Sequence, residues 1–184
     1  MEIKQLKVKI LKHYQNTSEH NLNQGLTWYN RAYNECLLLS QVFEIPLPKV
    51  VGVVAAISPR NKWNNNLKDA WNLLDKPSLS TKVSTFMGQR KKALDILACD
   101  GDDLTIMKIL GGQKTKNFYN NILHHVTSEA VTVDVWAFRS VGLPPTTKNF
   151  RFVEVAYREL ANELKMQPHQ LQAVVWGVVR GAIQ

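Results

Sequence analysis

The chain has 184 residues, of which 45% are hydrophobic, and its formal net charge is +8. A chain of this length and apolar content can bury a core without disulfides, which excludes a disordered or a disulfide-framed protein. The positive charge favours a polyanionic partner and assigns neither a fold nor a reaction. The two cysteines, Cys36 and Cys99, are too few for a metal cage, and we expect both to be small buried hydrophobes of a reduced protein.

The longest apolar run, residues 50–57, is far too short to cross a bilayer, and the N-terminal residues alternate charged with aliphatic side chains. We therefore expect no signal peptide, no membrane partner and a cytoplasmic, intracellular location. Association with a nucleoid and a viral origin of the gene are both compatible with this interpretation.

Helical periodicity dominates the N-terminal part of the chain. Residues 1–15 form a basic amphipathic helix pattern, and its lysines at positions 4, 7, 9 and 12 either approach DNA or form a solvated face, which we favour. A second helical stripe begins near Glu19 and continues to about Phe43, where Pro46 and Pro48 end it.

Periodicity alone does not decide whether residues 50–57 form a helix or a strand, because their β-branched side chains also suit a buried strand. We favour a buried helix, since a polar break at 58–62 separates the run from a new helical stripe. That stripe comprises Trp63, Leu67, Ala70, Trp71 and Leu74.

A loop at 77–84 precedes a further predicted helix at 85–97, whose Arg90-Lys91-Lys92 cluster either neutralises phosphates or is solvated. An acidic turn then leads to a short helix at 104–110. We expect Asp103 to cap that helix.

The most informative stretch is Leu110-Gly111-Gly112-Gln113-Lys114-Thr115-Lys116-Asn117. The adjacent glycines allow a tight turn with exposed backbone amides, and the Lys-Thr-Lys run opens a helix predicted to reach about His125. This combination offers N–H groups and positive charge to a phosphate.

Asp134 lies twenty residues after Lys114, as a lone carboxylate in an apolar run. Such a carboxylate usually has a partner or a task, so we expect it to cap the next helix and to meet Lys114. Two further helices, at 147–165 and from Pro168 onward, are predicted to complete an all-α chain of about nine helices.

Two of these segments carry a resemblance. Gly112-Gln113-Lys114-Thr115-x-Asn117, followed after about a dozen residues by Val133-Asp134-x-Trp136-x-Phe138-Arg139, is similar to the motifs of the helix-hairpin-helix DNA glycosylase superfamily, of the endonuclease III type. Two departures stand out: Leu110 occupies the place of the first hairpin glycine, and Trp136 replaces a histidine.

The resemblance implies a two-lobed, all-α glycosylase-like fold forming one domain over residues 1–184, with the hairpin near 104–125. It implies that Lys114 is the nucleophile and Asp134 the essential aspartate. The DNA contacts then come from the hairpin and from the loop after the helix at 50–57, and a base pocket is expected beside that loop. The predicted DNA-binding residues are Gly111, Gly112, Gln113, Thr115, Lys116, Arg60, Asn61 and Lys62, and those of the pocket are Ser58, Trp63 and Tyr29.

For the loop, a plain turn with Trp63 packed in the core is the alternative, and for Trp63 alone we favour it. The implied function is a DNA glycosylase with lyase activity, acting in base excision repair as a monomer on double-stranded DNA. Three alternatives stay open: a monofunctional glycosylase in which Asp134 activates water, a non-catalytic DNA-binding protein, and an enzyme acting on a modified nucleotide.

The expected cofactor set is small. The chain lacks the four-cysteine cluster that holds iron and sulfur in many relatives of the endonuclease III type, so we expect no iron-sulfur cluster and no other metal site. A monovalent cation at the hairpin is compatible with the resemblance. The excised base is not identified by any motif.

Overall fold

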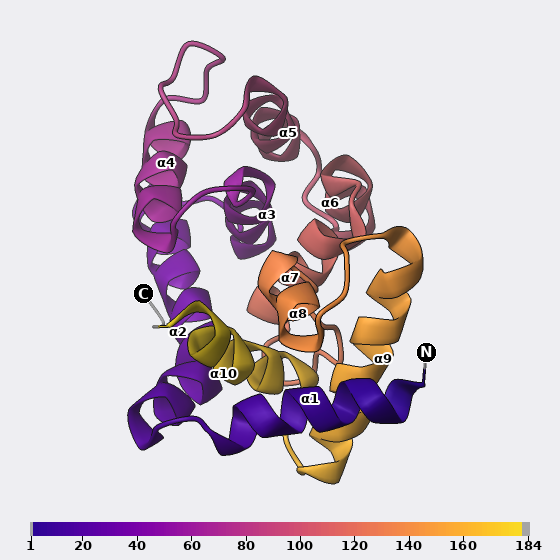
Figure 1. Cartoon of the computed structure of the whole chain (residues 1–184). Coiled ribbons are helices and arrows are strands. Elements are labelled where there is room, and N and C mark those ends of the chain that lie inside the picture. Colours follow the sequence, from indigo (N-terminus) through magenta and orange to yellow (C-terminus); the bar gives the residue numbers. More distant parts are fainter. Residues whose placement is uncertain (1, 182–184) are drawn as a thin grey trace. The chain divides into compact units, whose positions relative to one another are not determined.

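The computed structural model describes residues 2–181, and these form ten helices and no strand (Figure 1). The prediction of an all-α chain is confirmed, with one helix more than expected in the described part; Met1 lies outside it. The helices are α1 (Ile3–Gln15), α2 (Glu19–Phe43), α3 (Leu47–Ile57), α4 (Trp63–Asp75), α5 (Met87–Ala98), α6 (Asp103–Leu110), α7 (Gln113–Leu123), α8 (Val135–Val141), α9 (Thr147–Glu163) and α10 (Pro168–Arg180).

The helices group into two compact units, which are described separately below. Unit 1 contains residues 1–31 and 124–184, and unit 2 contains residues 32–123. Helix α2 contributes its first half to unit 1 and its second half to unit 2.

Helix α3 forms the centre of unit 2, where it packs against α4, α5, α6 and α7 (Figure 1). Every residue from Val50 to Ile57 is buried. A helix that is apolar on all sides must be surrounded by protein, so this environment explains why the run reads as continuous rather than striped. The prediction of a helix here, rather than a strand, is confirmed.

Helix α4 buries only part of its predicted apolar stripe. The buried face contains Asn66 and Asp69, whereas Trp71 is 47% exposed and packs edge-on against Phe43. Asn66 is tolerated inside because its amide nitrogen donates to the carbonyl of Val54 at 3.1 Å. The predicted stripe is therefore wrong for part of this helix.

The core of unit 1 lies between α1, α8, α9 and α10. It is formed by Leu6, Ile10, Val131, Val133, Ala137, Phe138, Val141, Val153, Ala156, Tyr157, Leu160, Ala161, Leu171 and Val175. Helices α2 and α10 come into backbone contact in this unit. A Cβ atom on Gly25 would lie 2.6 Å from the Cα atom of Val174, which leaves room for glycine but for no side chain.

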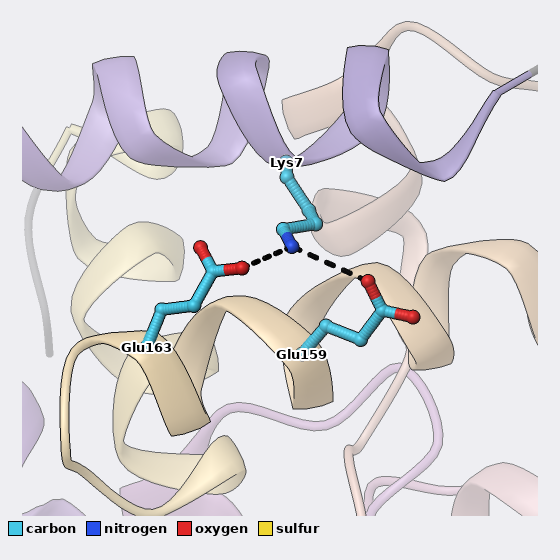
Figure 2. Close-up of polar contacts among 3 residues, drawn as sticks. All are labelled: Lys7, Glu159 and Glu163. Atoms are coloured by element: carbon cyan, nitrogen blue, oxygen red, sulfur yellow. Dashed lines mark hydrogen bonds and ion pairs between the residues drawn. The ribbon is translucent and has the colours of Figure 1, made fainter.

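Helix α1 is fastened to α9 by Lys7, whose amine pairs with Glu159 at 3.3 Å and also with Glu163 (Figure 2). Lys9 of the same helix donates to the carbonyl of Val141 at 2.8 Å. Two of the four lysines that we expected on a solvated or DNA-facing surface therefore bind groups of their own chain.

Candidate functional site

The turn between α6 and α7 consists of Gly111 and Gly112. Gly111 has a φ of +77°, which favours glycine. Its amide donates to the carbonyl of Met107 at 3.2 Å, and the amide of Gly112 donates to that of Leu110 at 3.0 Å. The expectation that these two glycines offer their amides to a phosphate is therefore wrong, because both N–H groups already have acceptors within the turn.

Lys92 of α5 holds this turn from outside. Its amine donates to the carbonyl of Leu110 at 2.7 Å and lies 3.5 Å from the position that a Cβ atom on Gly111 would take. A cation at the carbonyl end of a helix is favourable, because the last carbonyls lack partners and the helix dipole is negative there. The sequence did not reveal this contact, since the two residues lie eighteen positions apart.

The neighbours of Lys92 are also engaged. Arg90 donates to the carbonyl of Leu79, and Lys91 pairs with Asp95 at 2.8 Å. All three cations of the predicted phosphate-binding or solvated cluster thus have partners in unit 2.

The opposite end of the α6–α7 pair is closed by a buried hydroxyl. Tyr119 donates to Asp103 at 2.7 Å, and burial, followed by this bond, raises the pKa of the phenol. Asp103 was expected to cap α6, but the cap is Asp102, which accepts the amide of Thr105 at 3.0 Å. Hydrogen bonds from Thr105 lower the pKa of the Asp102 carboxyl to about 2.

Lys114 is the second residue of α7, and its side chain is exposed. In the same turn Gln113 donates to Asn117 at 2.7 Å, and the hydroxyl of Thr115 donates to the carbonyl of Gly112 at 2.8 Å. The helical hydrogen bonds begin with the amide of Lys116, which also donates to Gly112, at 3.1 Å. The amides that a helix start offers to an anion are therefore those of residues 113–115, not those of the glycines.

Asp134 lies in unit 1, at the N-cap of α8. One of its carboxylate oxygens accepts the amides of Trp136 and Ala137, both at 2.9 Å. The predicted capping role is confirmed. Lys114 belongs to unit 2, so the expected meeting of the two side chains stays a prediction.

Basic groups occupy the other end of α8. Lys9 donates to the carbonyl of Val141, and His13 lies 3.1 Å from the carbonyl of Ser140. The guanidinium group of Arg139 lies over the ring of Trp136, 4.5 Å from its centre. This short helix therefore has a carboxylate at its positive end and cations at its negative end, which suits the helix dipole.

The loop after α3 contains the other predicted contacts in unit 2. Arg60 adopts a φ of +58° and lies over the ring of Phe86, and Lys62 is exposed. Asn61 instead turns into the protein, where its amide donates to Asp69 at 2.8 Å. Ser58 donates to the carbonyl of Ala55.

The two aromatic residues of the predicted pocket lie in different surroundings. Trp63 is half-buried, and its indole N–H donates to Glu35 at 2.7 Å. Tyr29 is 4% exposed within unit 1, where its hydroxyl donates to Thr132 at 3.0 Å. Ser58 and Trp63 thus share a unit and Tyr29 lies in the other.

Sequence reasoning missed Asp69, a buried carboxylate on α4. It accepts from Asn61 and from the backbone amide of Ser84, each at 2.8 Å. Its place in a polar stretch of sequence gives no sign of burial, because both partners lie in loops outside its helix.

Within residues 2–181, no three His, Cys, Asp or Glu side chains are grouped closely enough to hold a metal ion. No single helix in this range has the length and apolar character of a membrane span, although α2 and α3 pass that test by length and composition as a pair bent by 119°.

Comparison with known proteins identifies a family for this chain. No curated protein and no solved structure matches the chain. A family model described as a family of unknown function, DUF7178, matches residues 1–183. Because the match covers nearly the whole chain, the protein belongs to the DUF7178 family.

Proposed function

We propose that the protein is a DNA glycosylase with lyase activity, in which Lys114 is the amine nucleophile and Asp134 its acidic partner. The observation that carries the proposal is the placement of the two residues at helix starts. Lys114 stands in the first turn of α7, behind a two-residue turn, and Asp134 is the N-cap of α8. These are the local positions that the resemblance to the helix-hairpin-helix glycosylases requires.

The charge of unit 2 supports DNA as the partner. Its segments 58–68, 76–94 and 104–123 contain no aspartate or glutamate. The last of them carries Lys108, Lys114 and Lys116 around the α6–α7 turn. Cations without interspersed carboxylates favour a phosphate backbone, whose binding releases counterions.

The chemistry would proceed on a nucleotide flipped out of the duplex. The unprotonated amine of Lys114 attacks C1′ of the sugar, and the bond from C1′ to the base breaks as the new C–N bond forms. The base leaves with one of the two amine protons, and the other passes to O4′ as the C1′–O4′ bond breaks and the sugar ring opens to an imine. Asp134 stabilises the cationic sugar or accepts the amine proton and passes it on. Loss of a proton from C2′ then drives β-elimination, which breaks the bond from C3′ to the phosphate oxygen.

A second candidate is a DNA-binding protein without catalysis. It is favoured by the exposure of Lys114 and by the use of an Asp134 oxygen as a helix cap. In this alternative the lysine is a phosphate contact and the aspartate a structural residue.

Borohydride trapping separates the two candidates. Duplexes that carry uracil, oxidised, alkylated or hypermodified bases would be incubated with the protein and reduced, so that an imine becomes a stable cross-link. We expect a cross-link with wild-type protein and with the control Lys108→Met, an exposed lysine of the same acid-free segment, and none with Lys114→Met.

The variant Asp134→Asn tests the carboxylate. Asparagine caps helices as well as aspartate does, so the fold should be kept while base release slows. Binding without any Lys114-dependent cross-link would remove the lyase chemistry. Binding without either a cross-link or release of a base would remove the enzymatic proposal and leave the DNA-binding one.

A further inference from the structure

Two loops of unit 2 flank α4: residues 58–62, which precede it, and residues 76–86, which follow it. Asp69, in the middle of that helix, is 4% exposed and reaches both. Its Oδ2 atom accepts the side-chain amide of Asn61 from the first loop and the backbone amide of Ser84 from the second, each at 2.8 Å. The hydroxyl of Ser84 lies 3.4 Å from the other carboxylate oxygen.

A buried carboxylate is costly unless hydrogen bonds replace its water. Here the compensating donors come from two separate loops, so each loop is fixed to the same helix and therefore to the other. Bonds to a charged acceptor are stronger than neutral ones, so this junction attaches both loops firmly to α4.

The loops also touch one another directly. The hydroxyl of Thr85 lies 3.5 Å from the carbonyl of Pro59, and the guanidinium group of Arg60 lies 5.6 Å from the centre of the Phe86 ring. Arg60 holds a φ of +58°, a conformation that non-glycine residues seldom adopt without support. The paired loops supply that support.

The outer side of the pair is basic and aromatic. Arg60, Lys62 and Lys82 are exposed, as are Phe86, at 55%, and Met87, at 72%. Neither 58–68 nor 76–94 contains a carboxylate. Cations bind phosphates, and an exposed aromatic ring stacks with a base, so the surface suits nucleic acid rather than an acidic protein.

We propose that Asp69 is a positioning residue that locks loops 58–62 and 76–86 together into one nucleic-acid-binding surface. The proposal rests on the proposed DNA-binding function and adds to it a residue that does not itself touch DNA. Loss of the carboxylate should release both loops, whereas loss of one donor should release one.

The test uses limited trypsin digestion of the full chain, which measures how readily the loops open in the absence of DNA. In Asp69→Asn, cleavage after Arg60, Lys62 and Lys82 should accelerate about tenfold, as expected for the loss of a hydrogen bond to a charged acceptor. The control Asp75→Asn makes the same charge change at an exposed position of the same helix and should be cleaved like wild type. Asn61→Ala should accelerate cleavage after Arg60 and Lys62 but not after Lys82.

DNA binding is measured in parallel by fluorescence anisotropy with a labelled duplex. We expect Asp69→Asn to weaken affinity several-fold and Asp75→Asn to leave it unchanged. The exchange Asn61→Asp with Asp69→Asn, which restores a donor and acceptor pair, should slow the digestion again.

Unchanged digestion of Asp69→Asn would overturn the locking role. Faster digestion with unchanged affinity would overturn the assignment of the loops as a DNA surface. If wild-type protein binds no duplex, that assignment fails together with the proposed function, and the digestion still decides the locking role on its own.

Discussion

Both interiors contain buried polar side chains, but that of unit 2 is organised around one fully apolar helix, whereas that of unit 1 holds a buried imidazole ring. In unit 2, residues 50–57 are all buried and packed on every side. In unit 1, His169 is 1% exposed and bonds through Nδ1 to the carbonyl of Ser128 at 3.2 Å, and Ser140 lies 2.9 Å from the hydroxyl of Tyr157.

This difference predicts which changes should lower the stability of each unit. Packing around α3 depends on side-chain volume, so the surroundings of this helix should respond mainly to changes of size. The stability of unit 1 depends in addition on the protonation state of the buried His169 and on the crossing of α2 and α10, where only glycine fits at position 25. Four sets of variants test this contrast; the first two have similar expected effects, and the effects of the third and fourth are smaller.

The largest effect is expected for Gly25→Ala in unit 1. The added Cβ would meet the backbone of Val174 at 2.6 Å, and backbone atoms cannot rotate away, so α2 and α10 must separate. We expect the free energy of unfolding to fall by about 3 kcal/mol, at the upper end for overpacked cores. Hydrogen exchange should accelerate in α8, α9 and α10 more than in α3.

Gly52→Ala is the counterpart in unit 2 and should cost less, about 1–2 kcal/mol, because its Cβ meets the side chains of Ile106 at 2.9 Å and Ile96 at 3.0 Å. The control is Gly88→Ala, which has no atom within 4 Å of its Cβ and gains helix propensity. If Gly25→Ala accelerated exchange equally in both units, the contrast between their interiors would have no bearing on stability.

The second effect is an acid sensitivity of unit 1. Burial lowers the pKa of His169 to about 4, from 6.5 in the unfolded chain. Protonation of His169 therefore favours the unfolded state. The contribution of the neutral ring to the free energy of unfolding is complete above pH 6.5 and is lost as the pH falls toward 4. The loss over this window should be about 3 kcal/mol.

Carboxylates also titrate in this range, and the positive charge of His125 opposes protonation of His169. The comparison is therefore made with His169→Gln, in urea titrations between pH 4 and 7. The variant should lose less stability than wild type over that window. Parallel curves for the two proteins would show that the imidazole is not the source of the acid sensitivity.

The sequence predicts the helices of both units well, because it records local periodicity and turn residues. The helix at 50–57 follows from the polar break after it and from the helical stripe that begins at Trp63. The face of α4 does not follow, since Asn66 and Asp69 are buried by acceptors and donors that lie elsewhere in the chain. Apolar periodicity cannot report a polar residue that is buried because its partner is distant.

For the candidate site, the sequence predicts which residues stand at helix starts but not how their neighbours are used. The cap formed by Asp134 is local and is predicted correctly. The amides of Gly111 and Gly112 were expected to be available. In a turn this short they donate to carbonyls earlier in the chain, that of Gly111 to Met107, four residues before it, and that of Gly112 to Leu110, two residues before it. The support from Lys92 is a tertiary contact and has no local signature.

The third set of variants compares two lysines, one from each unit, that donate to the last carbonyl of a helix. Lys92→Met and Lys9→Met keep the apolar stem and remove the donor to a helix-terminal carbonyl. We expect losses of about 1–2 kcal/mol for Lys92 and about 0.5–1 kcal/mol for Lys9, whose side chain is more exposed. Lys108→Met and Lys12→Met, both at exposed positions, are the matched controls.

Hydrogen exchange locates these effects, because each cap should protect the end of its own helix. Faster exchange in α6 is expected from the loss of Lys92, and in α8 from the loss of Lys9. If the free energy of unfolding falls no more for Lys92→Met and Lys9→Met than for the two controls, the capping bonds contribute no more to stability than a solvated lysine does.

The smallest effect is expected for Lys7→Met, which removes the pairs with Glu159 and Glu163 between α1 and α9 (Figure 2). Both carboxylates are about half exposed, with side-chain exposures of 51% and 58%, so water screens the attraction and the loss should be about 0.5 kcal/mol. The bond to Glu163 raises the pKa of Lys7, and its contribution is therefore constant at neutral pH and lost only in strong alkali. In 1 M salt the difference from wild type, measured by thermal unfolding, should shrink, while Lys4→Met should show none. A loss above that of Gly52→Ala that shrinks in 1 M salt would mean that unit 1 is held together by surface charge rather than by its interior.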